Sequence, residues 1–151
     1  MKQYQLGVIG AGNMGMAIAR GMVAAGTPAS SILLFNRSPE KRAARAAEGF
    51  AVTEDYICLY TACDTVLLAV KPQNFDEVLG QLAPVAANCR PLVLSVAAGV
   101  TFAKMQAALG ADCPVIRIMP NTPLMLGEGA TELVKNAAAT DEQLARVRAL
   151  F

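Results

Sequence analysis

Short apolar runs alternate with alanine-rich stretches along nearly the whole chain. The runs are continuously apolar and do not alternate with polar residues, which is typical of strands buried on both faces of a parallel sheet. Strands that alternate with helical stretches in this way indicate βαβ units. The pattern therefore predicts an α/β fold with a doubly wound, mostly parallel sheet. Its strands are expected at residues 5–9, 32–35, 50–53, 65–70, 92–96 and 115–119.

Residues at the ends of the helical stretches support this division. Residues 16–25 form the first helical run, and Ser38 places a capping hydroxyl before Pro39 at the first position of another helix. Thr101 opens a further alanine-rich helix. A glycine with a left-handed backbone commonly ends a helix, and glycines follow these runs at Gly26, Gly49 and Gly110.

The pattern changes towards the C-terminus. Residues 128–134 predict a last strand, which can be antiparallel. Thr140 and Gln143 then have the spacing of a capping box, which predicts a helix. Its apolar stripe is expected to need a partner and consists of Leu144, Val147 and Phe151. Because that stripe is still in progress at residue 151, we expect this chain to be the first domain of a longer protein.

Composition and charge exclude several classes of protein. Of 151 residues, 54% are hydrophobic, which fits one globular domain with a sizeable core. The net charge of +1 lacks the basic excess typical of proteins that bind nucleic acids or membrane surfaces. The chain contains no histidine, so its own residues supply no Ser-His-Asp triad and no histidine-ligated metal.

The cysteines and the N-terminus predict an intracellular protein without a metal site. Cys58, Cys63, Cys89 and Cys113 include no C-x-x-C pair and no zinc-binding spacing, so they are expected to be small buried hydrophobic residues. No signal peptide is apparent, and no apolar run reaches the roughly 18 residues that a membrane span requires. We therefore expect a cytoplasmic location and no membrane partner.

A glycine motif lies between the first predicted strand and the first helical run. It consists of Gly10, Ala11, Gly12, Asn13, Met14 and Gly15. In the G-x-G-x-x-G pattern, the first glycine permits a tight turn, the second lets the backbone approach a pyrophosphate, and the third allows close packing of helix and strand. The helix N-terminus adds unpaired N–H groups and a positive dipole. The motif predicts a dinucleotide site; the alternative is a loop that serves only turning and packing.

The residues after the second predicted strand bear on the choice of cofactor. Asn36, Arg37 and Ser38 occupy the place where enzymes specific for NAD carry an acid for the ribose 2′-hydroxyl. The guanidinium of Arg37 instead suits a 2′-phosphate. NADP(H) is therefore preferred, with NAD(H) as a second cofactor. The alternative is that Ser38 only caps a helix and Arg37 is only solvated.

Three further segments follow later strands, at residues 69–73, 95–99 and 119–123. A ligand of a doubly wound sheet lies outside the carboxyl ends of the strands, so these segments are expected to face it. Small residues and prolines there would form a smooth wall for a nicotinamide, although each segment is also compatible with an ordinary loop.

Together these motifs resemble a known family. Residues 10–15, 69–73, 95–100 and 117–123, in this order and spacing, resemble the N-terminal half of pyrroline-5-carboxylate reductase, the last enzyme of proline biosynthesis. The similarity covers essentially all 151 residues, and Met-Pro-Asn-Thr-Pro at 119–123 is its most specific part. The resemblance implies an NADP-binding Rossmann domain over residues 1–135. Residues 136–151 would begin a helix that leads to a helical dimerisation and substrate domain outside this chain.

The resemblance also implies an activity, the NAD(P)H-dependent reduction of 1-pyrroline-5-carboxylate, a cyclic imine, to L-proline. The glycine motif would hold the pyrophosphate, and Arg37 and Ser38, with Asn36 beside them, the 2′-phosphate. The stretch from adenosine to nicotinamide would contact Ala69, Val70, Lys71 and Pro72. The nicotinamide would be bordered by Ala97, Ala98 and Asn121. Lys71 and Asn121 are weak catalytic candidates in this chain, because the missing domain is expected to supply most of the catalytic groups. The alternative for Lys71 is that it only pairs with a nearby carboxylate or phosphate.

Two departures limit what the resemblance implies. Members of the family often have an asparagine near position 56 that reaches the cofactor, whereas this chain has Tyr56. The substrate pocket and the dimer interface belong to the missing half, so the full-length protein is expected to be a homo-oligomer and the isolated chain weakly active or inactive. Two other functions stay open: a related imine or β-hydroxyacid reductase, and a non-catalytic NADP(H)-binding or redox-sensing module.

Overall fold

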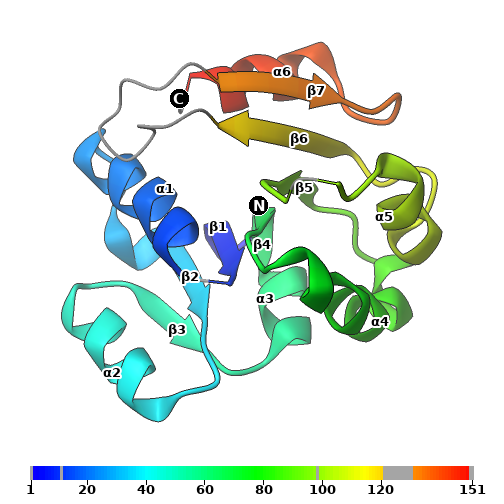
Figure 1. Ribbon diagram of the computed structural model, residues 1–151. Coiled ribbons are helices and arrows are strands. Elements are labelled where there is room, and N and C mark those ends of the chain that lie inside the picture. The colour runs from blue at the N-terminus through cyan, green and yellow to red at the C-terminus, as the bar shows by residue number, and fades with distance from the viewer. Residues whose placement is uncertain (1, 11, 98, 121–130, 150–151) are drawn as a thin grey trace.

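The computed structural model describes residues 2–10, 12–97, 99–120 and 131–149. In these residues one sheet has the strand order β3-β2-β1-β4-β5-β6-β7 (Figure 1). All neighbouring strands pair in parallel except β7, which is antiparallel to β6. The predicted doubly wound, mostly parallel sheet is confirmed. The strands are β1 (Tyr4–Ile9), β2 (Ile32–Phe35), β3 (Ala51–Thr53), β4 (Cys63–Leu68), β5 (Leu92–Ser95), β6 (Val115–Pro120) and β7 (Thr131–Lys135).

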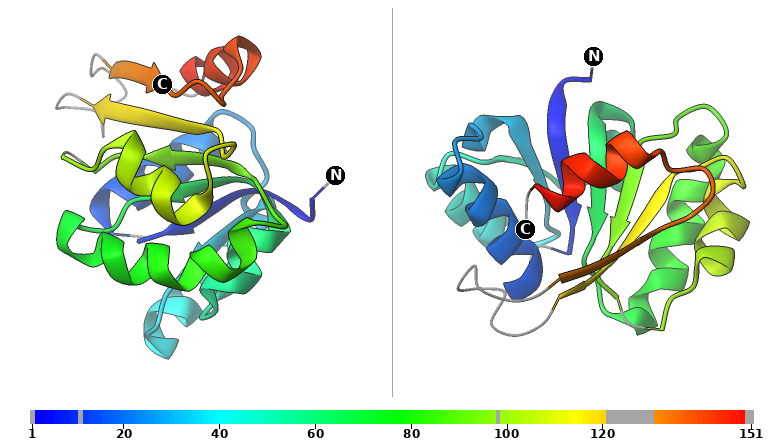
Figure 2. Two further views of the ribbon diagram at one scale, coloured as in Figure 1. Left: turned by 90° about the vertical axis from the view of Figure 1, so that its right-hand side faces the viewer. Right: turned by 90° about the horizontal axis from the view of Figure 1, so that it is seen from above.

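Helices cover both faces of the sheet (Figures 1 and 2). One face packs against α3 (Tyr56–Ala62), α4 (Phe75–Ala86) and α5 (Phe102–Leu109). The other packs against α1 (Asn13–Ala24) and α6 (Asp141–Arg148). Beside β3 lies α2 (Pro39–Ala47), and the described connections include two short 3₁₀ turns, η1 (Ala29–Ser31) and η2 (Pro72–Asn74).

Successive residues of each strand enter two separate cores. In β2, for example, Leu33 and Phe35 belong to the core beneath α3, α4 and α5, whereas Ile32 and Leu34 belong to the core beneath α1 and α6. All four side chains are buried. Since both faces of the strand exclude water, every position favours an apolar residue, which explains the continuously apolar runs.

Several predicted boundaries change. The first helix begins at Asn13 and not at residue 16, so it includes the end of the glycine motif. The fourth strand ends at Leu68, which leaves Ala69 and Val70 in the loop beyond the sheet. The predicted last strand is confirmed as the antiparallel β7 from Thr131 onward, whereas residues 128–130 lie outside the described part of the chain.

The predicted caps are confirmed by hydrogen bonds. Ser38 Oγ accepts from Lys41 N at 3.3 Å. At the start of α6, Thr140 Oγ1 accepts from Gln143 N at 3.0 Å, and Gln143 Oε1 accepts from Thr140 N at 2.8 Å. The positive φ angles expected after the helical runs are observed at Gly26, Gly49 and Gly110.

The apolar stripe on α6 packs against the sheet of this same chain. Val147 is only 2% exposed, and Leu144 packs against the same core. The stripe was expected to need a partner from outside this chain, and for these two residues that expectation is wrong, because they pack against the core of this chain. Phe151 lies outside the described residues.

The apolar pattern predicts no separate element over residues 54–62, where the structure contains α3. The signal that marks this helix is Asp55, whose carboxylate accepts from Ile57 N at 2.8 Å and from Cys58 N at 3.3 Å. An acidic N-cap before a mixed aromatic and aliphatic stretch is enough to start a short helix that packs on the sheet.

All four cysteines are free thiols, and all but Cys58 are buried. Burial raises the pKa of Cys63 to about 12, which keeps this thiol protonated. Among the described residues, no cluster of three or more potential metal ligands is present. The described helices are each too short or too polar to cross a membrane.

Candidate functional site

The glycine motif turns sharply at the carboxyl end of β1, directly against the end of β4. Gly10 has a φ of 92°, which side chains rarely allow. A Cβ atom at this position would come within 2.7 Å of the carbonyl carbon of Ala69 and the nitrogen of Val70. Both the conformation and the space therefore require glycine.

The other two glycines differ from each other. A Cβ atom on Gly15 would lie 2.7 Å from Gly10 O and 3.0 Å from Val8 Cγ1, so α1 packs very closely on β1. A Cβ atom on Gly12 would meet nothing within 4 Å, and the backbone here is accessible. Gly12 precedes α1 without a side-chain cap, and the first turn of α1 carries no acidic residue. The first N–H groups of a helix have no partner within it, so this end of α1 suits a phosphate.

An open groove with a volume of about 480 Å³ extends from this loop past the carboxyl ends of β2 and β4. That volume lies within the range of about 300–1,000 Å³ typical of small-molecule sites. The groove is lined by Gly10, Gly12, Phe35, Asn36, Arg37, Lys41, Tyr56, Ala69, Val70, Lys71, Asn74, Glu77 and Val78.

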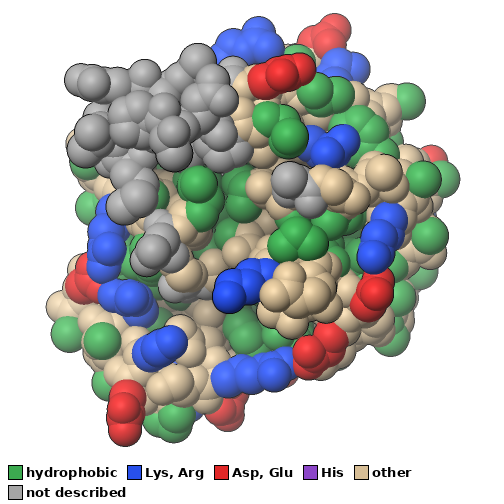
Figure 3. Space-filling model, viewed as in Figure 1, with side chains coloured by type: hydrophobic (Ala, Val, Ile, Leu, Met, Phe, Trp, Pro, Cys, Tyr) green, Lys and Arg blue, Asp and Glu red, His purple; other side chains and the backbone are tan. Residues whose placement is uncertain are grey.

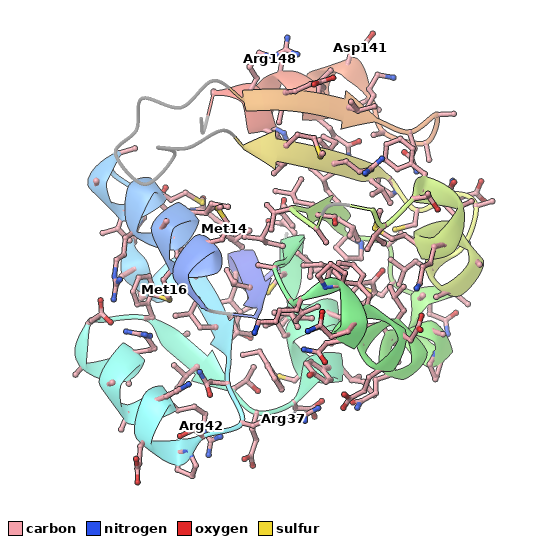
Figure 4. The ribbon with its side chains drawn as sticks, viewed as in Figure 1. Met14, Met16, Arg37, Arg42, Asp141 and Arg148 are labelled. Carbon is pink, nitrogen blue, oxygen red and sulfur yellow. The ribbon has the colours of Figure 1, made fainter. Side chains whose placement is uncertain are left out.

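The loop after β2 is held in place by Arg42, which lies beside Arg37 in Figure 4. Arg42 Nη1 donates to the carbonyl oxygens of Asn36 at 2.9 Å and of Arg37 at 3.1 Å. Asn36 Oδ1 in turn accepts from Ser38 N at 3.0 Å. These bonds fix the backbone from which the Arg37 side chain extends.

The Arg37 side chain contacts two residues on other elements, Tyr56 on α3 and Glu77 on α4. Its Nη2 donates to the Tyr56 hydroxyl at 3.2 Å and to the carboxylate of Glu77. The Tyr56 ring stacks on Phe35 with centroids 3.9 Å apart and lies 5.7 Å from the Arg37 guanidinium. The hydrogen bond that Arg37 donates to Glu77, and then the contact with Tyr56, raise the pKa of Arg37, so the guanidinium stays charged.

Positive charge predominates among the residues that line the groove. Among the described lining residues, Arg37, Lys41 and Lys71 provide three cations, against the single carboxylate of Glu77. Figure 3 shows basic side chains across the lower part of this face, with acidic ones beside them. Such a balance favours an anionic ligand that contacts both the glycine motif and the end of β2.

The structure brings together about half of the predicted site residues. Those that line the groove are Gly10, Gly12, Asn36, Arg37, Ala69, Val70 and Lys71. Met14 packs against the core, the Ser38 hydroxyl caps α2, and Pro72 begins η2. Ala97 is 6% exposed and lies in the core beneath α5. Ala11, Ala98 and Asn121 lie outside the described residues, as does the side chain of Asn13.

Six lining residues are absent from the predicted site: Phe35, Lys41, Tyr56, Asn74, Glu77 and Val78. Tyr56 stands out in the sequence only as a departure from the asparagine common in the family. Glu77 reaches the groove from α4, 40 residues beyond Arg37 in the chain. Tyr56 and Glu77 are brought next to Arg37 by the packing of α3 and α4 on the sheet, which the local sequence does not show.

Comparison with known proteins agrees with this geometry. A protein-family model described as "NADP oxidoreductase coenzyme F420-dependent" matches residues 5–99. The chain belongs to this family. The pyrroline-5-carboxylate reductase of Pseudomonas aeruginosa is 39% identical over 144 residues, which are 95% of this chain and 52% of that protein.

Solved structures extend the similarity to the fold. A pyrroline-5-carboxylate reductase from Coxiella burnetii superposes with a TM-score of 0.90 at 32% identity, over 98% of this chain and 55% of that chain. A pyrroline carboxylate reductase from Plasmodium falciparum with NADP bound superposes with a TM-score of 0.82 at 25% identity, over 100% of this chain and 55% of that chain.

The chain is therefore similar in sequence and fold to the N-terminal NAD(P)-binding domain of pyrroline-5-carboxylate reductases. The predicted resemblance and the predicted cofactor class, NADP, are confirmed. The chain spans about half the length of the relatives that it matches.

Proposed function

We propose that this chain supplies the cofactor-binding half of an enzyme that reduces 1-pyrroline-5-carboxylate to L-proline with NADPH. The observation that carries the proposal is the similarity to pyrroline-5-carboxylate reductases over nearly the whole chain, at 39% identity to the Pseudomonas aeruginosa enzyme. A related imine or β-hydroxyacid reductase is the second candidate, and the Met-Pro-Asn-Thr-Pro segment at 119–123 favours the first.

In this proposal the two ends of the groove bind the two phosphate groups of the cofactor. Backbone N–H groups at the start of α1 donate to the pyrophosphate. Arg37, oriented by Tyr56 and assisted by Lys41, donates to the 2′-phosphate. Asn36 and Ser38 shape the loop, while Ala69, Val70, Lys71 and Pro72 guide the cofactor towards the carboxyl end of β4.

Beyond that point the nicotinamide would lie near Ala97, Ala98 and Asn121, with Lys71 and Asn121 as candidate catalytic residues. When bound, NADPH supplies the hydride that reduces the C=N bond, so this chain contributes mainly binding and orientation. No histidine is needed for such a role.

Turnover is proposed to need more than these 151 residues. The matched relatives are about twice as long, and in them the remaining half is available to hold the imine and to form subunit contacts. We propose residues 1–135 as the NADP-binding domain and 136–151 as the start of the connection to that half. A homo-oligomer in the cytoplasm, where the four free thiols of this chain would stay reduced, completes the proposal.

The test combines binding and turnover. The 151-residue chain is titrated with NADPH, and the protein as the cell makes it is assayed for NADPH oxidation and L-proline formation from 1-pyrroline-5-carboxylate. Binding by the chain together with substrate-dependent L-proline formation by the whole protein is expected. Tight NADPH binding without oxidation by the whole protein would contradict the proposal. Oxidation that then occurs with another imine would indicate a related imine reductase, and no oxidation with any imine would indicate a sensing module.

A further inference from the structure

We propose that Glu77 is a selectivity residue: its carboxylate competes with the 2′-phosphate of NADPH for Arg37 and so reduces the preference for NADPH over NADH. The proposal rests on the proposed role of Arg37 in binding the 2′-phosphate. It adds a residue on a different element, α4, which lowers the preference for NADPH over NADH, whereas Arg37 raises it.

The position of Glu77 makes this competition direct. Glu77 lies in the first turn of α4 and lines the same groove as Arg37 and Lys41. Its Oε1 accepts a hydrogen bond from Arg37 Nη2, and this pair joins α4 to the loop after β2. The guanidinium that is proposed to hold the phosphate therefore already donates to an anion.

Bringing a 2′-phosphate to this end of the groove has two costs that a 2′-hydroxyl avoids. The nitrogen of Arg37 must exchange the carboxylate for the phosphate. The carboxylate and the phosphate are then neighbours, and both are negative and only accept hydrogen bonds. A 2′-hydroxyl has no charge and can donate a hydrogen bond to a carboxylate. The Glu77 carboxylate therefore does not repel NADH at this position.

Tyr56 provides the contrast. Its hydroxyl also accepts from Arg37, at 3.2 Å, but it is neutral and its ring is fixed by stacking on Phe35. Tyr56 can orient Arg37 without repelling a phosphate. Of the two described side chains that accept from Arg37, Glu77 is therefore the one that opposes the phosphate. Because the side chains of Arg37 and Glu77 are 62% and 51% exposed, water and salt screen their interaction and its effect is moderate.

The test compares ligands with and without the 2′-phosphate. Dissociation constants of the 151-residue chain are measured by calorimetry for NADPH and NADH, and for adenosine 2′,5′-bisphosphate and 5′-AMP, which lack the nicotinamide. For Glu77→Gln we expect NADPH and the bisphosphate to bind about three- to tenfold more tightly. NADH and 5′-AMP should change by less than about twofold.

Asp76→Asn is the matched control, because it removes the same charge from the same turn of α4. Asp76 pairs with Lys104 at 2.9 Å and does not line the groove. This variant should leave all four affinities within about twofold of the wild-type values. Thermal melting of each variant verifies that it is folded.

The outcomes separate the selectivity role from the proposed function. Unchanged or weaker binding of NADPH by Glu77→Gln, or equal gains for NADPH and NADH, would overturn the role of Glu77. Equal gains in Asp76→Asn would do the same, because they would reveal a general charge effect. If the wild-type chain binds the bisphosphate no better than 5′-AMP, the proposed role of Arg37 fails as well.

Discussion

The two ends of the cofactor groove are formed by different parts of the protein, one by the backbone and the other by side chains. At the glycine motif, the backbone forms the site, and a Cβ atom at Gly10 would lie 2.7 Å from the backbone of the loop that follows β4. At the end of β2, charged and aromatic side chains from three elements form it, led by Arg37, Tyr56 and Glu77. A backbone site tolerates little change, whereas a side-chain site can be adjusted one residue at a time. We therefore expect the first end to support binding of either cofactor and the second to choose between them.

The largest effect is expected at the backbone end, for Gly10→Ala. Alanine would have to adopt a φ of 92° and displace the backbone of Ala69 and Val70. We expect a loss of about 2–4 kcal/mol in the free energy of unfolding. Binding of NADPH and of NADH should be lost together. Denaturant unfolding and cofactor titration measure the two quantities.

Gly12→Ala is the matched control for this change, because its added methyl group would meet no atom within 4 Å. It should cost less than about 1 kcal/mol of stability. Since the methyl group extends into the groove, cofactor binding should weaken while the fold persists. Equal stability losses at Gly10 and Gly12 would contradict the packing argument.

An intermediate and selective effect is expected at the side-chain end, for Arg37→Asp. The change removes the proposed phosphate donor and adds a repelling charge beside Glu77. NADPH affinity should fall by about 10- to 100-fold. NADH affinity should change by less than about threefold. An equal loss for both cofactors would remove Arg37 from the 2′-phosphate site and erase the proposed difference between the two ends.

The smallest effect is expected for Tyr56→Phe. This change keeps the ring stacked on Phe35 and removes only the hydroxyl that accepts from Arg37 at 3.2 Å. NADPH affinity should fall by less than about threefold, with stability preserved within about 1 kcal/mol. Tyr60→Phe is the control, since its hydroxyl lies 3.9 Å from Cys113 Sγ in the core, away from the groove. A tenfold loss for Tyr56→Phe alone would show that Tyr56 fixes Arg37 far more strongly than we infer.

Most of the fold can be read from local patterns. Continuously apolar runs identify the strands because both sheet faces are covered, and capping residues such as Ser38 and Thr140 identify helix starts. Prediction from these patterns fails where an element is defined by its tertiary contacts and carries few local signals. In α3, the buried Tyr60 and Leu59 look like any apolar stretch, and only Asp55 marks the helix. In α6, the stripe that suggests an absent partner packs on the sheet of this chain.

The sequence by itself determined the backbone end of the site. A tight turn, an accessible backbone and a close helix contact each need glycine, and the glycine motif provides these glycines at a fixed local spacing. The same holds for Arg37, since the end of a strand and the absence of an acid are both local features. The tertiary structure alone decided that Tyr56 and Glu77 meet Arg37. Their contact depends on how α3 and α4 pack over the sheet, and no local spacing encodes the distance between side chains 19 and 40 residues away.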